Sequence, residues 1–155
     1  MIPNLFGIGM AMAGAIAVTT TAGLSRAAAT PVPEDAALFA SIDGGELSLT
    51  DWRGQPVLVV ITAALCGFTD QYADLQALQE RYGEELVVLT VPSDSFNQEL
   101  ATADEVVAFC EINYGLDLPM TEITPVRGPE AHPFYGWLAE VEGVVPRWNF
   151  TKVLL

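Results

Sequence analysis

Residues 56–72, PVLVVITAALCGFTDQY, decide the fold because they join a buried strand directly to a helix. The run 56–62 is continuously apolar and rich in β-branched residues, which is typical of a central strand that is buried on both faces. Residues 70–82 place apolar side chains at helical spacing, and Gly83 supplies a stop. The sequence therefore predicts a strand and a helix that are joined through residues 66–69.

The same pattern follows once more along the chain. A second apolar run, 86–91, predicts another buried strand. After a polar loop, Thr102 and Glu105 have the spacing of a capping box, which predicts a helix that carries Cys110 and ends near Gly115. Strands that alternate with helices indicate an α/β domain.

The remaining segments extend this alternation. LPMTEIT (118–124) predicts a short strand, HPFYGWLAEVE (132–142) a helix with Pro133 at its first position, and RWNFTKVLL (147–155) a last strand. After a hairpin-like start, the predicted order is β-α-β-α-β-α-β. We expect one domain over 38–155, with no repeat, low-complexity block or internal linker.

The charge of the chain excludes one class of partner. The formal net charge is −14, with only 6 Lys and Arg residues. Nucleic-acid binding depends on basic residues that neutralise phosphates, so we expect no nucleic-acid partner. An acidic balance is also the ordinary composition of a well-solvated surface, and it names no function.

The first 29 residues have the pattern of a secretory signal peptide. They contain no acidic residue, run apolar from Leu5 to about Val18, and end in three alanines at 27–29. The apolar run is too short and too rich in glycine for a membrane span. We therefore expect cleavage after residue 29, export to a bacterial periplasm, no stable membrane span after cleavage, and an extended lead-in over 30–37.

Cys66 stands where sites occur in α/β sheets, just past the carboxyl end of a strand. The start of a helix favours a thiolate, which makes Cys66 a candidate nucleophile. A lone cysteine after an apolar run is also often an inert, small apolar residue. With Cys110 it could instead form a structural disulfide in an exported chain. The local sequence leaves these alternatives open.

Four segments in chain order, LCGFTDQYADLQALQERYGEELVVL, FCEINYGLDLPM, AHPFYGWL and WNFTK, resemble the glutathione peroxidase family. The resemblance covers about residues 38–155. It implies a thioredoxin-like fold, with a central mixed β-sheet flanked by helices, and a thiol peroxidase that reduces hydrogen peroxide or organic hydroperoxides. The thioredoxin-dependent, monomeric, bacterial type of the family is the most similar, which implies an antioxidant role in the response to oxidative stress.

The resemblance also implies the site residues. Cys66 matches the peroxide-reducing residue, and Gln98, Trp148 and Asn149 match the three partners that complete a catalytic tetrad. An indole N–H and two side-chain amides can donate hydrogen bonds to a thiolate without a neighbouring cation. Read alone, Trp148 would be a core aromatic residue of a strand, and the two amides ordinary polar positions.

Cys110 matches the resolving cysteine of the thioredoxin-dependent members. The sulfenic acid formed at Cys66 would condense with Cys110 to a disulfide, which a thioredoxin-like protein or glutathione would reduce. The acidic chain and Leu65, next to the nucleophile, favour the protein reductant. Cys110 could instead be an inert thiol in the core of its helix. We expect no cofactor and no metal.

The sequence departs from the family at three places. Residues 61–65, ITAAL, are less polar than the family's usual segment before the nucleophile, which suggests a thinner polar shell around the nucleophile. Ser93 stands where a third cysteine is frequent, and the family continues past Leu155 into a further strand and helix. We therefore expect either a fragment of a longer protein or, if the chain ends at Leu155, an exposed apolar edge strand over 148–155. His132, just before Pro133, predicts a capping or packing role.

Two other functions remain open at this stage. The altered loop and the missing elements suggest a non-catalytic redox sensor or partner-binding module on a thioredoxin-like fold. An exported thiol-disulfide oxidoreductase is disfavoured, because residues 66–69, CGFT, lack the second cysteine of a Cys-x-x-Cys motif.

Overall fold

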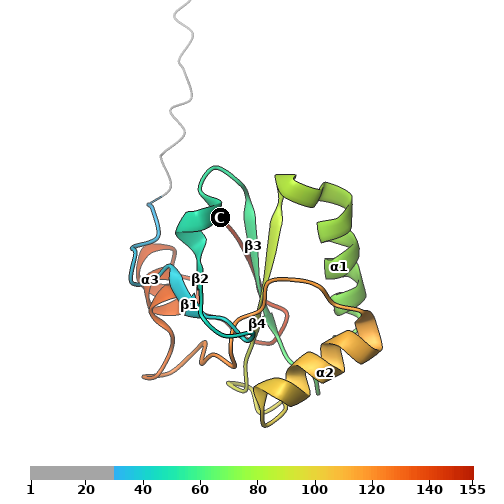
Figure 1. The fold of residues 1–155 in the computed structure, drawn as a ribbon. Helices are drawn as coiled ribbons and strands as arrows, with labels where there is room; N and C mark the ends of the chain where they lie inside the picture. The colour runs from blue at the N-terminus through green and yellow to red at the C-terminus, as the bar shows by residue number, and fades with distance from the viewer. Residues whose placement is uncertain (1–29) are drawn as a thin grey trace, which may run out of the picture.

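The computed structural model describes residues 30–155 (Figure 1). The predicted signal peptide, 1–29, lies outside the described residues. After a turn at 34–36, β1 (Leu38–Ala40) and β2 (Glu46–Ser48) form an antiparallel hairpin, which confirms the hairpin-like start. A 3-10 helix, η1 (Leu49–Trp52), then leads to the main sheet.

The main sheet has the strand order β4-β3-β5. Its centre is β3 (Val57–Thr62), paired in parallel with β4 (Val87–Pro92) and antiparallel with β5 (Lys152–Leu154). The sheet is therefore mixed, and the predicted central, buried strand is confirmed. All residues of β3 except Leu58 are buried. The continuous apolar run that marked this strand in the sequence follows from burial on both faces.

Helices cover both faces of this sheet (Figure 1). Side chains alternate between the faces along β3, so Val60 packs in one apolar cluster and Val59 and Ile61 in another. The helical elements that follow η1 are α1 (Gln71–Tyr82), η2 (Gly83–Glu85), α2 (Ala103–Tyr114) and α3 (Pro133–Val141). The cluster that contains Val60 includes side chains of α1 and α2. The cluster that contains Val59 and Ile61, on the opposite face of the sheet, includes side chains of α3 and of the hairpin.

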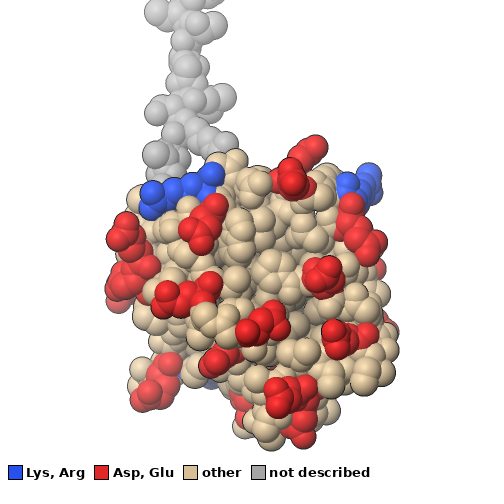
Figure 2. Space-filling model, viewed as in Figure 1, with Lys and Arg blue, Asp and Glu red and all other residues tan. Residues whose placement is uncertain are grey.

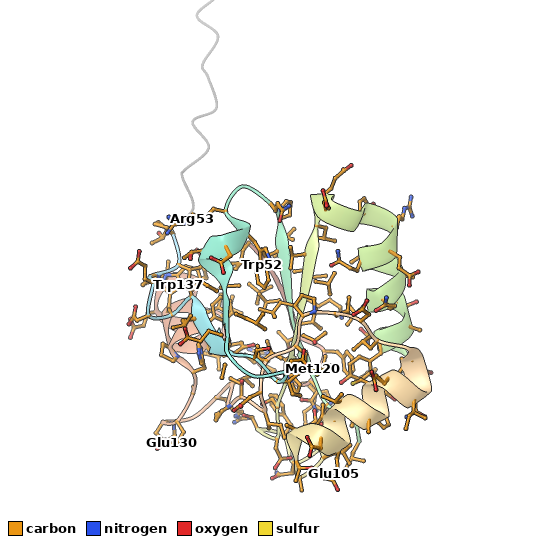
Figure 3. All side chains as sticks on the ribbon, viewed as in Figure 1. Trp52, Arg53, Glu105, Met120, Glu130 and Trp137 are labelled. Atoms are coloured by element: carbon orange, nitrogen blue, oxygen red, sulfur yellow. The ribbon has the colours of Figure 1, made fainter. Side chains whose placement is uncertain are left out.

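The helix ends are those that the sequence predicts. The Thr102 hydroxyl accepts a hydrogen bond from the Glu105 N–H, and the Glu105 side chain accepts one from the Thr102 N–H, so α2 begins with a complete capping box. Glu105 lies at the start of α2 in Figure 3. Gly115 ends α2 in the left-handed conformation, with φ 58°. Gly83 ends α1, also with positive φ.

Two predicted strands differ from the structure. Residues 118–124 form no strand and contact their neighbours through isolated bridges, Thr90 with Met120 and Ser41 with Thr121. Pro119 lacks the N–H that a continued ladder would need. The last strand is β5 alone, not 147–155, because a turn at 148–150 precedes it.

The edge position of β5 agrees with the sequence expectation. This strand pairs only with β3 in the described structure, and the Leu154 side chain is 67% exposed. None of the helices within residues 30–155 has the length and apolar character that crossing a membrane requires.

The capping box of α2 gives a first prediction. Replacing Thr102 by alanine removes the hydroxyl that accepts the Glu105 N–H, and we expect the free energy of unfolding of the reduced protein to fall by about 1 kcal/mol. Urea denaturation followed by circular dichroism measures it. Thr102→Ser keeps the hydroxyl and should retain most of the stability. Equal losses in the two variants would contradict the capping role.

Candidate active site

Cys66 lies in a loop between β3 and α1. The loop leaves the sheet after Thr62, and α1 begins only at Gln71, so Cys66 precedes the helix by more than one turn. Its side chain is 4% exposed, whereas the neighbouring Leu65 and Phe68 are 61% and 52% exposed. The thiol therefore lies below the surface, between two exposed apolar side chains.

Gln98 and Asn149 meet next to this loop. The Asn149 Nδ2 donates a hydrogen bond to the Gln98 Oε1, with 3.0 Å between the two atoms. The Leu65 N–H, adjacent to Cys66, donates to the Gln98 carbonyl oxygen at 2.9 Å. Asn149 is buried, and its Oδ1 has no hydrogen-bond partner. The structure thus brings together three predicted site residues that lie far apart in the sequence: Cys66, Gln98 and Asn149.

Trp148 lies in the turn before β5 and not within a strand, so the reading of it as a strand core residue is wrong. Its indole is 45% exposed and packs against Phe96, with the ring centroids 5.3 Å apart. The Arg127 guanidinium lies 5.4 Å from the centre of the Phe96 ring. The sequence around Arg127 contains no pattern that predicts its contact with the Phe96 ring.

The turn that carries Trp148 is fixed to the end of β3. Phe150 has a φ of 60°, which non-glycine residues rarely adopt. Its N–H donates to the Ile61 carbonyl oxygen at 2.7 Å, and the Ile61 N–H donates to the Thr151 carbonyl oxygen at 3.1 Å. Asn149 is therefore held at the end of β3 by the backbone hydrogen bonds of the two residues that follow it.

Glu99, the residue after Gln98, lies at the site and was not among the residues that the sequence predicted. Its Oε1 accepts the N–H groups of Ala64 at 3.0 Å and Leu100 at 2.9 Å. The side chain is 7% exposed, and its Oε2 is buried without a hydrogen-bond partner. Burial raises the pKa of the Glu99 carboxyl above its usual range. Its position directly after Gln98 is the signal that the sequence offers.

Cys110 lies in α2 and is 1% exposed. It belongs to the same apolar cluster as Cys66 and Tyr72, and both cysteines are free thiols. Burial raises the pKa of the Cys110 thiol to about 11, and the Glu99 carboxylate contributes a smaller part of the increase. The Tyr72 hydroxyl lies beside this thiol without a hydrogen bond of regular geometry, and burial raises the pKa of Tyr72 as well.

His132 has the capping and packing role that its position predicted. Its Nδ1 accepts the Phe134 N–H at 3.2 Å, and its Nε2 lies 2.9 Å from the Leu38 carbonyl oxygen. The imidazole stacks on Phe39 at 4.1 Å. Burial lowers the pKa of His132, which favours the neutral ring that this stack contains.

The side chains at the site suit thiol chemistry. Across residues 30–155, no three His, Cys, Asp or Glu side chains are grouped closely enough to hold a metal ion. Near the Cys66 loop the polar groups are the Gln98 and Asn149 amides, the Glu99 carboxylate and backbone N–H groups; the amide and backbone N–H groups are neutral donors. Donors of this kind stabilise a thiolate through hydrogen bonds.

Comparisons with known proteins agree with this chemistry. The family model described as glutathione peroxidase matches residues 36–139. The glutathione peroxidase homolog BsaA of Halalkalibacterium halodurans is 43% identical over 120 residues, which cover 74% of this chain and 76% of that protein. The hydroperoxy fatty acid reductase gpx1 of Synechocystis sp. is 39% identical over 127 residues, which cover 74% of this chain and 75% of that protein.

A solved structure supports the same relationship. The crystal structure of Trgpx in its apo form is 29% identical, with a TM-score of 0.56, and the match covers 79% of this chain and 78% of that one. The fold is thus the thioredoxin-like α/β fold that the sequence implied. From the matched segment and these relatives, the chain belongs to the glutathione peroxidase family and is a thiol peroxidase.

Proposed function

We propose that Cys66 is the peroxidatic residue of this enzyme and that Gln98, Trp148 and Asn149 complete its site. The observation that carries the proposal is the convergence of Gln98 and Asn149, hydrogen-bonded to each other, on the backbone next to Cys66. The Cys66 thiolate attacks one peroxide oxygen and the O–O bond breaks. Cys66 becomes a sulfenic acid, and the other oxygen takes a proton and leaves as water or an alcohol.

The second step of the proposal uses Cys110. The Cys110 sulfur attacks the Cys66 sulfenic sulfur, an S–S bond forms, the S–O bond breaks, and the oxygen leaves as water with the thiol proton. Membership of one apolar cluster supports the pairing of the two cysteines. Because Cys110 is buried within α2, part of this helix must open before the sulfurs meet.

The surface around Cys66 supports a protein reductant of the thioredoxin type. Leu65, Phe68 and Trp148 are exposed apolar side chains on the segments that meet at the site. Glutathione is an anion, and acidic side chains are spread over the face seen in Figure 2, where basic ones are few. Apolar contact with a protein partner is therefore favoured over capture of a small anion.

The same apolar surface supports organic hydroperoxides as substrates alongside hydrogen peroxide. The Synechocystis relative is named for the reduction of hydroperoxy fatty acids. An alkyl chain could lie against Leu65 and Phe68 while its peroxide group reaches the buried thiol. Peroxide removal of this kind is an antioxidant activity that serves the response to oxidative stress.

The proposal also covers the cellular location of the enzyme and its oligomeric state. The apolar stretch and the three alanines within the first 29 residues support a signal peptide and export to a bacterial periplasm. The stretch between Pro133 and Trp148 is short and lacks the insertion through which tetrameric members of the family assemble, which supports a monomer.

Loss of the Cys66 sulfur tests the peroxidatic role. We expect Cys66→Ser to lower peroxide consumption at least about 1,000-fold, since removing a catalytic nucleophile leaves little of the covalent route. Peroxide consumption with a thioredoxin system measures turnover. Cys110→Ser is the matched control: it should still consume about one equivalent of peroxide in a first oxidation, then stop or slow. Unchanged consumption by Cys66→Ser would overturn the proposal.

The buried state of Cys110 gives a prediction for stability against pH. Its pKa rises from the ordinary 9.0 to about 11 on folding, so the folded protein holds the thiol proton more tightly than the unfolded chain. The stability from this difference is present below pH 9.0 and is lost as the pH rises through about 11. We expect the free energy of unfolding of the reduced protein to decline over this range, more steeply in the wild type than in Cys110→Ala. Urea titrations at a series of pH values measure the two slopes, and equal slopes would contradict the burial of this thiol.

A further inference from the structure

Glu99 connects two loops of the site through a single carboxylate oxygen. The Ala64 N–H reaches this oxygen from the loop that carries Cys66, and the Leu100 N–H reaches it from the segment that carries Gln98. Next to it, the Leu65 N–H donates to the Gln98 carbonyl oxygen. Two hydrogen bonds, from Ala64 to Glu99 and from Leu65 to Gln98, therefore join the Cys66 loop to the segment that carries Gln98, and the Leu100 N–H holds the Glu99 carboxylate within that segment.

The environment of Glu99 is unfavourable for a residue that only stabilises the fold. Its second oxygen is buried and accepts no hydrogen bond, and both bonds to the first oxygen come from neutral N–H groups. Asp94 lies nearby, its Oδ1 accepting the Glu99 N–H at 3.1 Å, and adds a second negative charge. A buried carboxylate without a cationic partner lowers stability, and ionisable groups in such surroundings cluster at functional sites.

The bonded groups explain what this carboxylate can do. Ala64 is two residues before Cys66, so a shift of its N–H moves the thiol relative to the Gln98 and Asn149 amides. Hydrogen bonds that stabilise a reacting thiolate depend on distances held to a fraction of an ångström. No side chain of residues 61–65 accepts the Ala64 N–H, the Thr62 hydroxyl being without a hydrogen-bond partner, and Glu99 accepts it from another loop.

We propose that Glu99 is a positioning residue for the peroxidase reaction, which holds the Cys66 loop in place against Gln98 by accepting the Ala64 and Leu100 N–H groups. This inference rests on the proposed role of Cys66. It concerns the geometry of the site, and Glu99 itself does not contact the peroxide.

Three substitutions of Glu99 separate positioning from folding. Glu99→Gln keeps an acceptor oxygen, Glu99→Ala removes the side chain, and Glu99→Leu fills the space with a similar volume but offers no acceptor. Glu130, an exposed acid that projects from the loop before α3 in Figure 3, receives the same three changes as the matched control. Circular dichroism and thermal melts confirm that each variant is folded at the assay temperature.

Two rates are measured on the full, reduced protein. The first is the second-order rate of Cys66 oxidation by hydrogen peroxide, followed by stopped-flow tryptophan fluorescence. The second is the rate of Cys66 alkylation by iodoacetamide, followed by mass spectrometry of the Cys66 peptide. Alkylation depends on exposure and thiolate content, whereas peroxide reduction also requires the amide donors to be in place.

We expect Glu99→Leu and Glu99→Ala to slow oxidation about 10- to 100-fold, as small displacements of reacting groups do, without a matching loss of alkylation. Glu99→Gln should retain the oxidation rate to within about threefold, because its amide oxygen still accepts the Ala64 N–H. The Glu130 variants should match the wild type in both rates.

Three results would overturn the inference. They are a wild-type oxidation rate in Glu99→Leu, equal losses in Glu99→Gln and Glu99→Leu, or parallel losses of oxidation and alkylation that follow the melting temperature. A wild-type protein that forms no sulfenic acid at Cys66 would overturn the proposed function together with the inference. The rate of the wild type therefore distinguishes the two failures.

Discussion

The central position of β3 is the constraint on which the site depends. Four backbone hydrogen bonds at its carboxyl end reach three other segments: Phe150 and Thr151 bond to Ile61, Ser93 bonds to Thr62, and Leu65 bonds to Gln98. An edge strand could not do this, because one of its sides would have no neighbour. The proposed tetrad therefore comes from three distant parts of the chain and meets where this strand ends.

The two thiols differ because they occupy different kinds of structure. Cys66 is buried in a loop outside any helix, with the exposed apolar side chains of Leu65 and Phe68 close to it in the chain. Cys110 lies inside a capped helix, where burial raises its pKa to about 11 and keeps it protonated. A free second thiolate beside the first would compete with it for peroxide. Burial in α2 thus prevents the Cys110 thiol from reacting until the helix opens. The capping box at Thr102 and Glu105 adds to the free energy that this opening requires.

The elements that the sequence predicted correctly are those whose signal is local. β3 and β4 are continuous apolar runs, α2 has its capping box, and α3 begins at a proline. The extent of β5 was not predictable, because the turn before it depends on the positive φ of Phe150 and on bonds to Ile61, 89 residues earlier in the chain. Likewise, the strand expected at 118–124 has a suitable composition, but Pro119 has no N–H and the segment makes only isolated bridges to Thr90 and Ser41.

Residues 61–65, which are apolar except for Thr62, lie mostly in the core of the protein. As a sequence they suggested a thinner polar shell around Cys66. In the fold, Ile61, Ala63 and Ala64 are buried, and only Leu65 of this run reaches the surface. Polar side chains at the buried positions would need partners in the core, and the one that is present, Thr62, has none for its hydroxyl.

The polar shell instead comes from other segments. The Gln98 carbonyl oxygen and the Glu99 carboxylate accept the backbone N–H groups of this loop, and the Asn149 amide reaches Gln98 from the turn before β5. A change of the loop to apolar residues is compatible with a working site as long as these acceptors remain. The residues that make such a substitution tolerable therefore lie outside the substituted stretch, and an inspection of the stretch alone underestimates the polarity around the thiol.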